Sequence, residues 1–149
     1  MCLKLRNIPF SPPDMSEAEI DEVCEAMRSG WITTGPRTKE FERLIAMCCQ
    51  TMRCDGDGKP QPTTVCLNSA TACMELALRV LGVGPGDEVI VPAYTYTATA
   101  SVVCHVGAKV VMVDCAPDSF EMDYAKLAEA ITERTKVIIP VDLAGVVTD

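Results

Sequence analysis

Hydrophobic and polar positions change period along the chain, and from residue 64 onward strand-like and helix-like segments alternate. Short apolar runs predict four strands, at residues 65–67, 88–91, 109–113 and 136–141. Apolar side chains at helical spacing predict three intervening helices, at residues 70–81, 97–106 and 124–131. Repeated strand–helix–strand units imply a parallel sheet with right-handed crossovers. The runs EVIV, KVVMV and KVIIPV are continuously apolar, which is typical of strands buried on both faces.

The first 50 residues predict two helices and no strand. Ser16 and Glu19 form a capping box before a helical stripe that ends near Gly30. A second stripe carries Phe41, Leu44, Ile45 and Cys48. The loop at 54–62 reads DGDG, like a calcium loop, but Lys59 and Cys66 stand where ligands belong. We therefore expect a solvated turn there.

Charge and composition exclude several classes of function. The formal net charge is −8 at pH 7, and no basic run could neutralise a nucleic-acid backbone or an anionic membrane. No apolar run approaches the ~20 residues that a membrane-spanning helix needs. The N-terminal stretch lacks the apolar core of a signal peptide, so we expect a cytoplasmic protein.

The nine cysteines are expected to be reduced, because their number is odd and no secretion signal precedes them. Cys66, Cys73 and Cys104 fall within apolar patterns and are predicted to be buried thiols. No pair has C-x-x-C spacing, and His105 is the single histidine, so no metal site is expected.

The junction at 64–81 is the strongest candidate site. It passes from an apolar run through Ser69, Ala70 and Thr71 into an amphipathic helix. The unpaired N–H groups of a first helical turn and the helix dipole attract a phosphate dianion. The alternative is that Ser69 only caps a core helix and binds nothing.

A second candidate lies just after the predicted strand at 88–91, where Tyr94 and Tyr96 follow. Ligands of open parallel sheets bind at the carboxyl edge, where the Ser69–Thr71 turn would also open. An aromatic ring beside a phosphate site suits a flat phosphorylated heterocycle. Equally, both tyrosines could be anchors that pack the loop against helix ends.

Five segments occur in the order found in a known family. They are GWITTGP at 30–36, NSATA at 68–72, GDEVIVPAYTYTAT at 86–99, GAKVVMVD at 107–114 and RTKVIIPVDLAG at 134–145. Together they resemble the N-terminal part of the DegT/DnrJ/StrS family of sugar aminotransferases, which depend on pyridoxal 5'-phosphate (PLP). The first two segments look closest to the branch that makes 4-amino-4-deoxy-L-arabinose on a UDP carrier.

The resemblance implies an α/β fold, the large domain of the aspartate-aminotransferase type (PLP fold type I), with a mostly parallel sheet and helices on both faces. Residues 1–50 would form an N-terminal arm with two helices, and 64–149 the strand–helix units. PLP would lie at the carboxyl edge, and two subunits would build each active site, which implies a homo-oligomer.

The resemblance also assigns residues to roles. Ala70, Thr71 and Ala72 would hold the PLP phosphate, and Tyr96 would stack on the pyridine ring. Trp31, Thr33, Thr34 and Gly35 would border the nucleotide-sugar substrate, and Thr97 and Thr99 would line the pocket. Three positions depart from the family pattern: Asp142 replaces a usual histidine, Ala70 a usual glycine, and the loop at 51–63 is long.

The implied reaction moves an amino group from an amino acid, usually glutamate, to a keto-sugar nucleotide. It needs a lysine that forms a Schiff base with PLP, which in the family lies beyond residue 149. We therefore expect no catalytic residue here, no turnover by this chain alone, and self-association through uncovered apolar faces. Two alternatives stay open: a PLP-dependent sugar dehydratase of the same family, and a non-catalytic module that binds a phosphate ligand or nothing.

Overall fold

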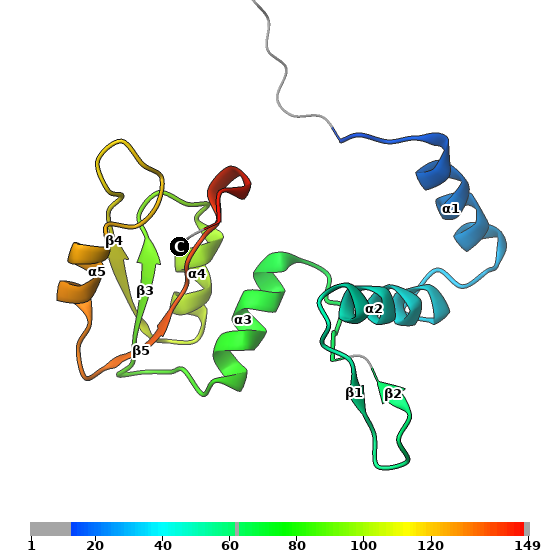
Figure 1. Ribbon diagram of the computed structural model, residues 1–149, viewed down its shortest axis with the longest axis horizontal. Coiled ribbons are helices and arrows are strands. Elements are labelled where there is room, and N and C mark those ends of the chain that lie inside the picture. The colour runs from blue at the N-terminus through cyan, green and yellow to red at the C-terminus, as the bar shows by residue number, and fades with distance from the viewer. Residues whose placement is uncertain (1–12, 62, 148–149) are drawn as a thin grey trace, which may run out of the picture. The chain divides into compact units, whose positions relative to one another are not determined.

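The chain divides into two units, Met1–Cys66 and Leu67–Asp149. The computed structural model describes residues 13–61 and 63–147. Figure 1 shows the helices and strands of both units. Within the described residues, no helix is both long and apolar enough to cross a membrane.

The first unit contains two helices and a small hairpin. Helix α1 (Glu17–Arg28) has the predicted capping box between Ser16 and Glu19, and α2 (Pro36–Cys48) begins with a proline. Strands β1 (Arg53–Cys54) and β2 (Pro60–Gln61) pair antiparallel, a hairpin that the sequence did not predict. The Asp55 carboxylate closes its tip by accepting hydrogen bonds from the Asp57 and Lys59 N–H groups, at 3.0 and 2.8 Å.

The second unit is the predicted alternation of helix and strand. Its elements are α3 (Ala70–Val80), β3 (Glu88–Pro92), α4 (Ala98–His105), β4 (Lys109–Val113), α5 (Tyr124–Ala130), β5 (Thr135–Ile138) and a 3₁₀ turn, η1 (Leu143–Gly145). The three strands pair in the order β4-β3-β5, and both ladders are parallel. The α/β fold with a parallel sheet is thereby confirmed.

Helices cover both faces of the central strand β3. Val89 and Val91 pack with Leu78, Val102 and Val103 from α3 and α4. Ile90, which points to the opposite face, packs with Val113 and Met122, and Leu127 of α5 lies against that cluster. Every residue of β3 is buried, as its continuous apolar run predicts.

The predictions for the other strands need correction. β4 and β5 are partly exposed, because among the described strands each has a neighbour on one side only. β5 also ends at Ile138 rather than residue 141. Residues 65–67 form no strand, since no described strand pairs with them, and the Cys66 N–H donates to the Glu42 carboxylate instead (2.8 Å).

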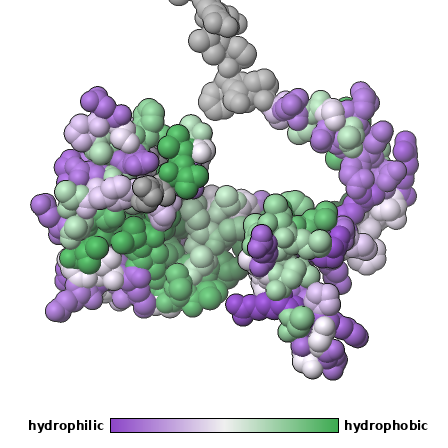
Figure 2. Space-filling view, in the orientation of Figure 1, coloured by the Kyte–Doolittle hydropathy of each residue, from purple (hydrophilic) through white to green (hydrophobic). Residues whose placement is uncertain are grey.

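The prediction of buried thiols was also wrong. Cys73 and Cys104 are exposed and Cys66 is only half-buried. Figure 2 shows hydrophobic surface on the second unit. The exposed apolar residues there include Leu76 and Val80 of α3 and its C-cap Leu81, which are 44%, 78% and 57% exposed. An apolar helical stripe predicts a face that can be covered; it does not say whether the residues present cover it.

Candidate functional site

The first turn of α3 has the features of an anion site. Ser69 is its N-cap, in extended conformation, and its Oγ accepts a hydrogen bond from the Ala72 N–H at 3.1 Å. Ala70 and Thr71 come first in the helix, where N–H groups have no intrahelical acceptor. No acidic residue lies in this turn, so nothing there opposes an anion.

The residues of this turn differ in what they can offer. The Ala72 N–H is already satisfied by Ser69, whereas in the described part of the chain the Ala70 and Thr71 N–H groups meet no acceptor. Ala70 is exposed, and Thr71 is half-buried with its hydroxyl in the same turn. Two amides and one hydroxyl are thus available to bind an anion. The Ala72 N–H could donate to a ligand only after giving up its hydrogen bond to the Ser69 hydroxyl.

The loop after β3 lies at the carboxyl edge of the sheet. Figure 1 shows the arrowheads of β3 and β4 and the first turn of α3 directed to the same side of the unit. Tyr96 is 79% exposed and lines a groove of about 460 Å³ with residues of α4 and β4, among them Ala100, Cys104 and Met112. Thr97 lines the same groove, whereas Thr99 is buried and hydrogen-bonds Thr95 (3.1 Å between hydroxyl oxygens).

The two tyrosines of this loop have different environments. Tyr94 stacks on Phe120, with ring centroids 5.4 Å apart and an interplanar angle of 19°. Tyr94 is therefore a loop anchor, the reading that the sequence left open for both tyrosines. Tyr96 has no ring partner among the residues described and presents most of its surface to solvent.

The predicted substrate-side residues form a turn in the first unit. The Trp31 indole N–H donates to the Thr34 carbonyl at 3.0 Å. Its ring lies against Gly35, which is buried. Trp31 and Thr33 also line an apolar groove of about 710 Å³ with residues of α1 and α2 that include Val23 and Arg37. Trp31 thus shapes this turn as well as bordering the groove.

Any side chain at position 35 would collide with the Trp31 ring, and this collision, rather than the backbone conformation, requires glycine there. A β-carbon built there would lie 2.0 Å from Trp31 Nε1 and 2.5 Å from Cδ1. We expect Gly35→Ala to displace the indole and to lower the free energy of unfolding of this unit by about 1–3 kcal/mol. Because Trp31 is the only tryptophan, a shift in its fluorescence emission measures the displacement.

Gly56→Ala is the matched control for this prediction. A β-carbon at Gly56 meets nothing within 4 Å, so emission and stability should stay at their wild-type values. Unchanged Trp31 emission in Gly35→Ala would contradict the packing described here.

The amino edge of the sheet holds a charged cluster that the sequence analysis missed. Glu88, only 2% exposed, accepts from Thr132 Oγ1 (2.7 Å), Arg134 Nη2 (2.9 Å) and Lys109 Nζ (3.0 Å). The Thr132 hydroxyl first, and then Lys109 and Arg134, lower the pKa of Glu88 from 4.5 to about 2. Beside it, Lys136 bridges Asp87 Oδ2 (3.1 Å) and the Gly82 carbonyl (2.6 Å).

This cluster also accounts for two of the lysines. Lys109 and Lys136 are bound at the amino edge, on the side of the sheet opposite the loop that carries Tyr96. Lys126 of α5 pairs with Asp123, the N-cap of that helix, and Lys39 and Lys59 belong to the first unit. Among the described residues of the second unit, no lysine lines the groove beside Tyr96.

Comparison with known proteins identifies the family. The profile of the DegT/DnrJ/EryC1/StrS aminotransferase family matches residues 13–149. The chain belongs to this family. The sequence-based recognition of the family and of its fold is thereby confirmed.

Individual members of the family are also similar. The UDP-4-amino-4-deoxy-L-arabinose–oxoglutarate aminotransferase of Shewanella sediminis is 44% identical over 142 residues, which are 95% of this chain and 34% of that protein. Spr1654 of Streptococcus pneumoniae, assigned as a sugar aminotransferase, is 65% identical in its PLP form, with a TM-score of 0.85. DesV of S. venezuelae, solved with a ketimine intermediate, is 37% identical with a TM-score of 0.74 over 89% of this chain and 33% of that chain.

The match covers a part of each relative. The chain aligns over 97% of its own length with 34% of Spr1654, which has been solved in PLP and pyridoxamine-phosphate (PMP) forms. It thus spans about a third of the length of these family members.

Proposed function

We propose that this chain provides the phosphate-binding turn and the ring-covering tyrosine of a PLP-dependent sugar aminotransferase. The observation that carries the proposal is the first turn of α3, which offers two amides, a hydroxyl and no carboxylate. Its support from the comparisons is membership of an aminotransferase family with relatives solved in PLP and PMP forms.

The residues present fit the phosphate group of such a cofactor. The Ala70 and Thr71 amides and the Thr71 hydroxyl would hold the dianion, with Ala72 joining if Ser69 releases it. Tyr96 would cover one face of the ring and exclude water from it, since its side chain is exposed and lies in the loop at the carboxyl edge. When bound, PLP supplies the electron sink for amino transfer.

The substrates proposed are a keto-sugar nucleotide and an amino-acid donor. The Shewanella relative is named for UDP-4-amino-4-deoxy-L-arabinose and oxoglutarate, and glutamate is the amino acid that yields oxoglutarate when it gives up its amino group. Trp31, Thr33, Thr34 and Gly35 would border the sugar nucleotide, and two subunits would complete each site. Because no described lysine of the second unit lines the groove beside Tyr96, we propose that the 149-residue chain binds the cofactor without turnover.

Titration calorimetry with PMP tests the proposal directly. PMP lacks an aldehyde, so it cannot form imines with surface lysines. We expect wild-type chain to bind PMP and inorganic phosphate to compete with it. Thr71→Val removes one hydroxyl at nearly constant volume and should weaken PMP binding at least about 10-fold, because a hydrogen bond to a charged group contributes roughly 1.5–3 kcal/mol.

Thr38→Val is the matched control, since Thr38 is also half-buried and in the first turn of a helix. It should leave PMP affinity unchanged. Absence of PMP and phosphate binding in the wild-type chain would refute the proposal. Binding of phosphate with no preference for PMP would instead favour a module for another phosphate ligand.

A further inference from the structure

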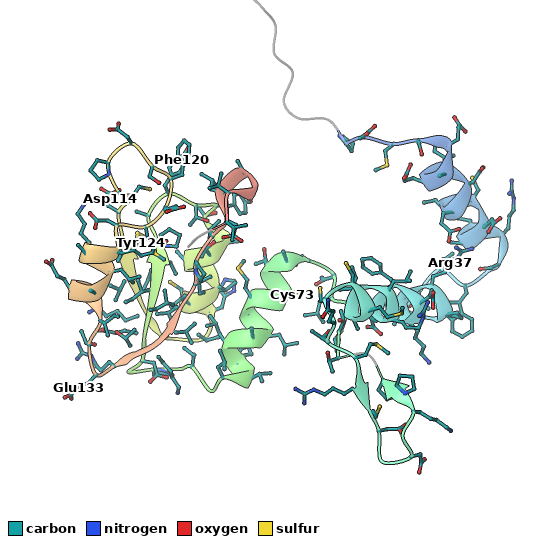
Figure 3. The ribbon with its side chains drawn as sticks, viewed as in Figure 1. Arg37, Cys73, Asp114, Phe120, Tyr124 and Glu133 are labelled. Carbon is teal, nitrogen blue, oxygen red and sulfur yellow. The ribbon has the colours of Figure 1, made fainter. Side chains whose placement is uncertain are left out.

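Phe120 lies where loops from the carboxyl ends of all three strands come together. It stacks on Tyr94 of the loop after β3 and itself belongs to the loop after β4. It also lines a small cavity of about 200 Å³ with Val141, Leu143 and Val146, which follow β5. Figure 3 shows Phe120 at one end of the sheet and Glu133 at the other.

The loop that carries Phe120 is held in a defined shape. Cys115 and Met122 form an isolated antiparallel bridge, and the Ala116 N–H donates to the Glu121 carbonyl at 3.0 Å. Met122 is 4% exposed and packs in the core with Ile90 and Val113. The Phe120 ring is therefore presented from a loop that is anchored in the core two residues later.

Hydrogen bonds hold the backbone of the loop that carries Tyr96, and in one of them the Tyr96 carbonyl accepts from the Thr99 N–H at 3.1 Å. The Ala93 N–H donates to the Val113 carbonyl (2.8 Å) at its start, and the Thr95 and Thr99 hydroxyls are 3.1 Å apart near its end. Between these points, the only ring-stacking contact among the described residues is Tyr94 on Phe120. Tyr96 follows two residues later and is itself 79% exposed.

From this arrangement we propose that Phe120 is a positioning residue, which acts through Tyr94 to orient Tyr96 over the cofactor ring. The role toward a ring rests on the proposed function. The contact with Tyr94 and its effect on the Tyr96 loop do not depend on any ligand. Loss of the stack leaves the first turn of α3 in place, so it should affect recognition of a ring and not of phosphate.

Fluorine NMR of chain labelled with 3-fluorotyrosine tests the positioning without a ligand. The chain has three tyrosines, and single Tyr→Phe variants assign their resonances. Phe120→Leu should shift the Tyr94 and Tyr96 resonances. Phe120→Tyr, which keeps the ring and adds a fourth fluorine resonance of its own, should restore both. Phe120 is 59% exposed, so the core remains intact in these variants.

Phe41→Leu is the matched control, because Phe41 is 56% exposed and has no stacked ring among the described residues. It should leave the Tyr96 resonance at its wild-type position. An unchanged Tyr96 resonance in Phe120→Leu would overturn the proposal, whether or not the chain binds PMP.

Titration with PMP and with inorganic phosphate then separates recognition of the ring from recognition of the phosphate. In Phe120→Leu, PMP affinity should fall about 3- to 10-fold, the range expected for one ring interaction, while inorganic phosphate affinity stays constant. Equal losses of affinity for PMP and for phosphate would overturn the positioning role, since they would indicate that the substitution disrupts the whole carboxyl edge of the sheet. A wild-type chain that binds neither probe refutes the proposed function, and the fluorine spectra still decide whether Phe120 orients Tyr96.

Discussion

Thr71→Glu is expected to abolish PMP binding while leaving the fold as stable as the wild type or slightly more so. A carboxylate in the first turn of α3 would stand where the phosphate dianion is proposed to bind. At about 4 Å, one pair of unit charges repels by about 4 kcal/mol in a partly screened site, so affinity should fall at least about 100-fold. The same carboxylate interacts favourably with the helix dipole, by about 0.3–1 kcal/mol.

The opposite signs of the two effects make this prediction specific. PMP titration measures the binding, and urea unfolding of the same samples measures the stability. Ala125→Glu is the matched control, since it adds the same charge at the second residue of α5, at an exposed position. PMP affinity that survives Thr71→Glu, or that falls equally in Ala125→Glu, would place the phosphate elsewhere.

Glu88→Gln is expected to remove a large part of the acid sensitivity of the sheet unit. The pKa of Glu88 is about 2 in the folded chain and should return to its ordinary value of 4.5 on unfolding. Between these values the unfolded chain binds one more proton than the folded chain, so stability rises with pH. The contribution of Glu88 is complete above pH 4.5 and is lost as the pH falls through about 2.

Urea unfolding between pH 2 and pH 6 measures this effect. The slope of stability against pH should be smaller in Glu88→Gln by about one proton between the two pKa values. The variant should also be less stable at pH 6, because the buried side chain loses its ion pairs with Lys109 and Arg134. Glu133→Gln removes the same charge from an exposed side chain nearby and should keep the wild-type slope; equal slopes for all three proteins would contradict the role of Glu88.

The elements of the second unit were predictable because local pattern and tertiary environment agree there. The apolar spacing of residues 70–81 gave α3 to within one residue. The continuous apolar run gave β3, which among the described strands is the one with neighbours on both sides. The same reasoning failed at 65–67, where an apolar run meets no described strand to pair with. It also failed for Cys73 and Cys104, because periodicity does not reveal which face of a helix is covered.

The candidate site also has one part that the sequence could predict and one part that it could not. The α3 turn could be found from sequence, since a cap residue and a helical stripe are local signals. Which of its amides remain available could not, because that depends on the Ser69 hydroxyl reaching Ala72. The only sequence signal for a role of Phe120 was its place in a loop after a predicted strand. Its contact with Tyr94 could not be predicted, because it joins residues 26 positions apart in the chain.

The sequence by itself determined the family, the parallel α/β architecture and the position of the first α3 turn. Each of these depends on short-range pattern: helical spacing, apolar runs and motifs in a fixed order. Only the tertiary structure decided that Tyr94 is an anchor while Tyr96 is exposed, and that Glu88 is buried among Lys109, Thr132 and Arg134. The reason is that these contacts form where parallel strands bring together loops and strand ends that lie 20 to 50 residues apart in the chain.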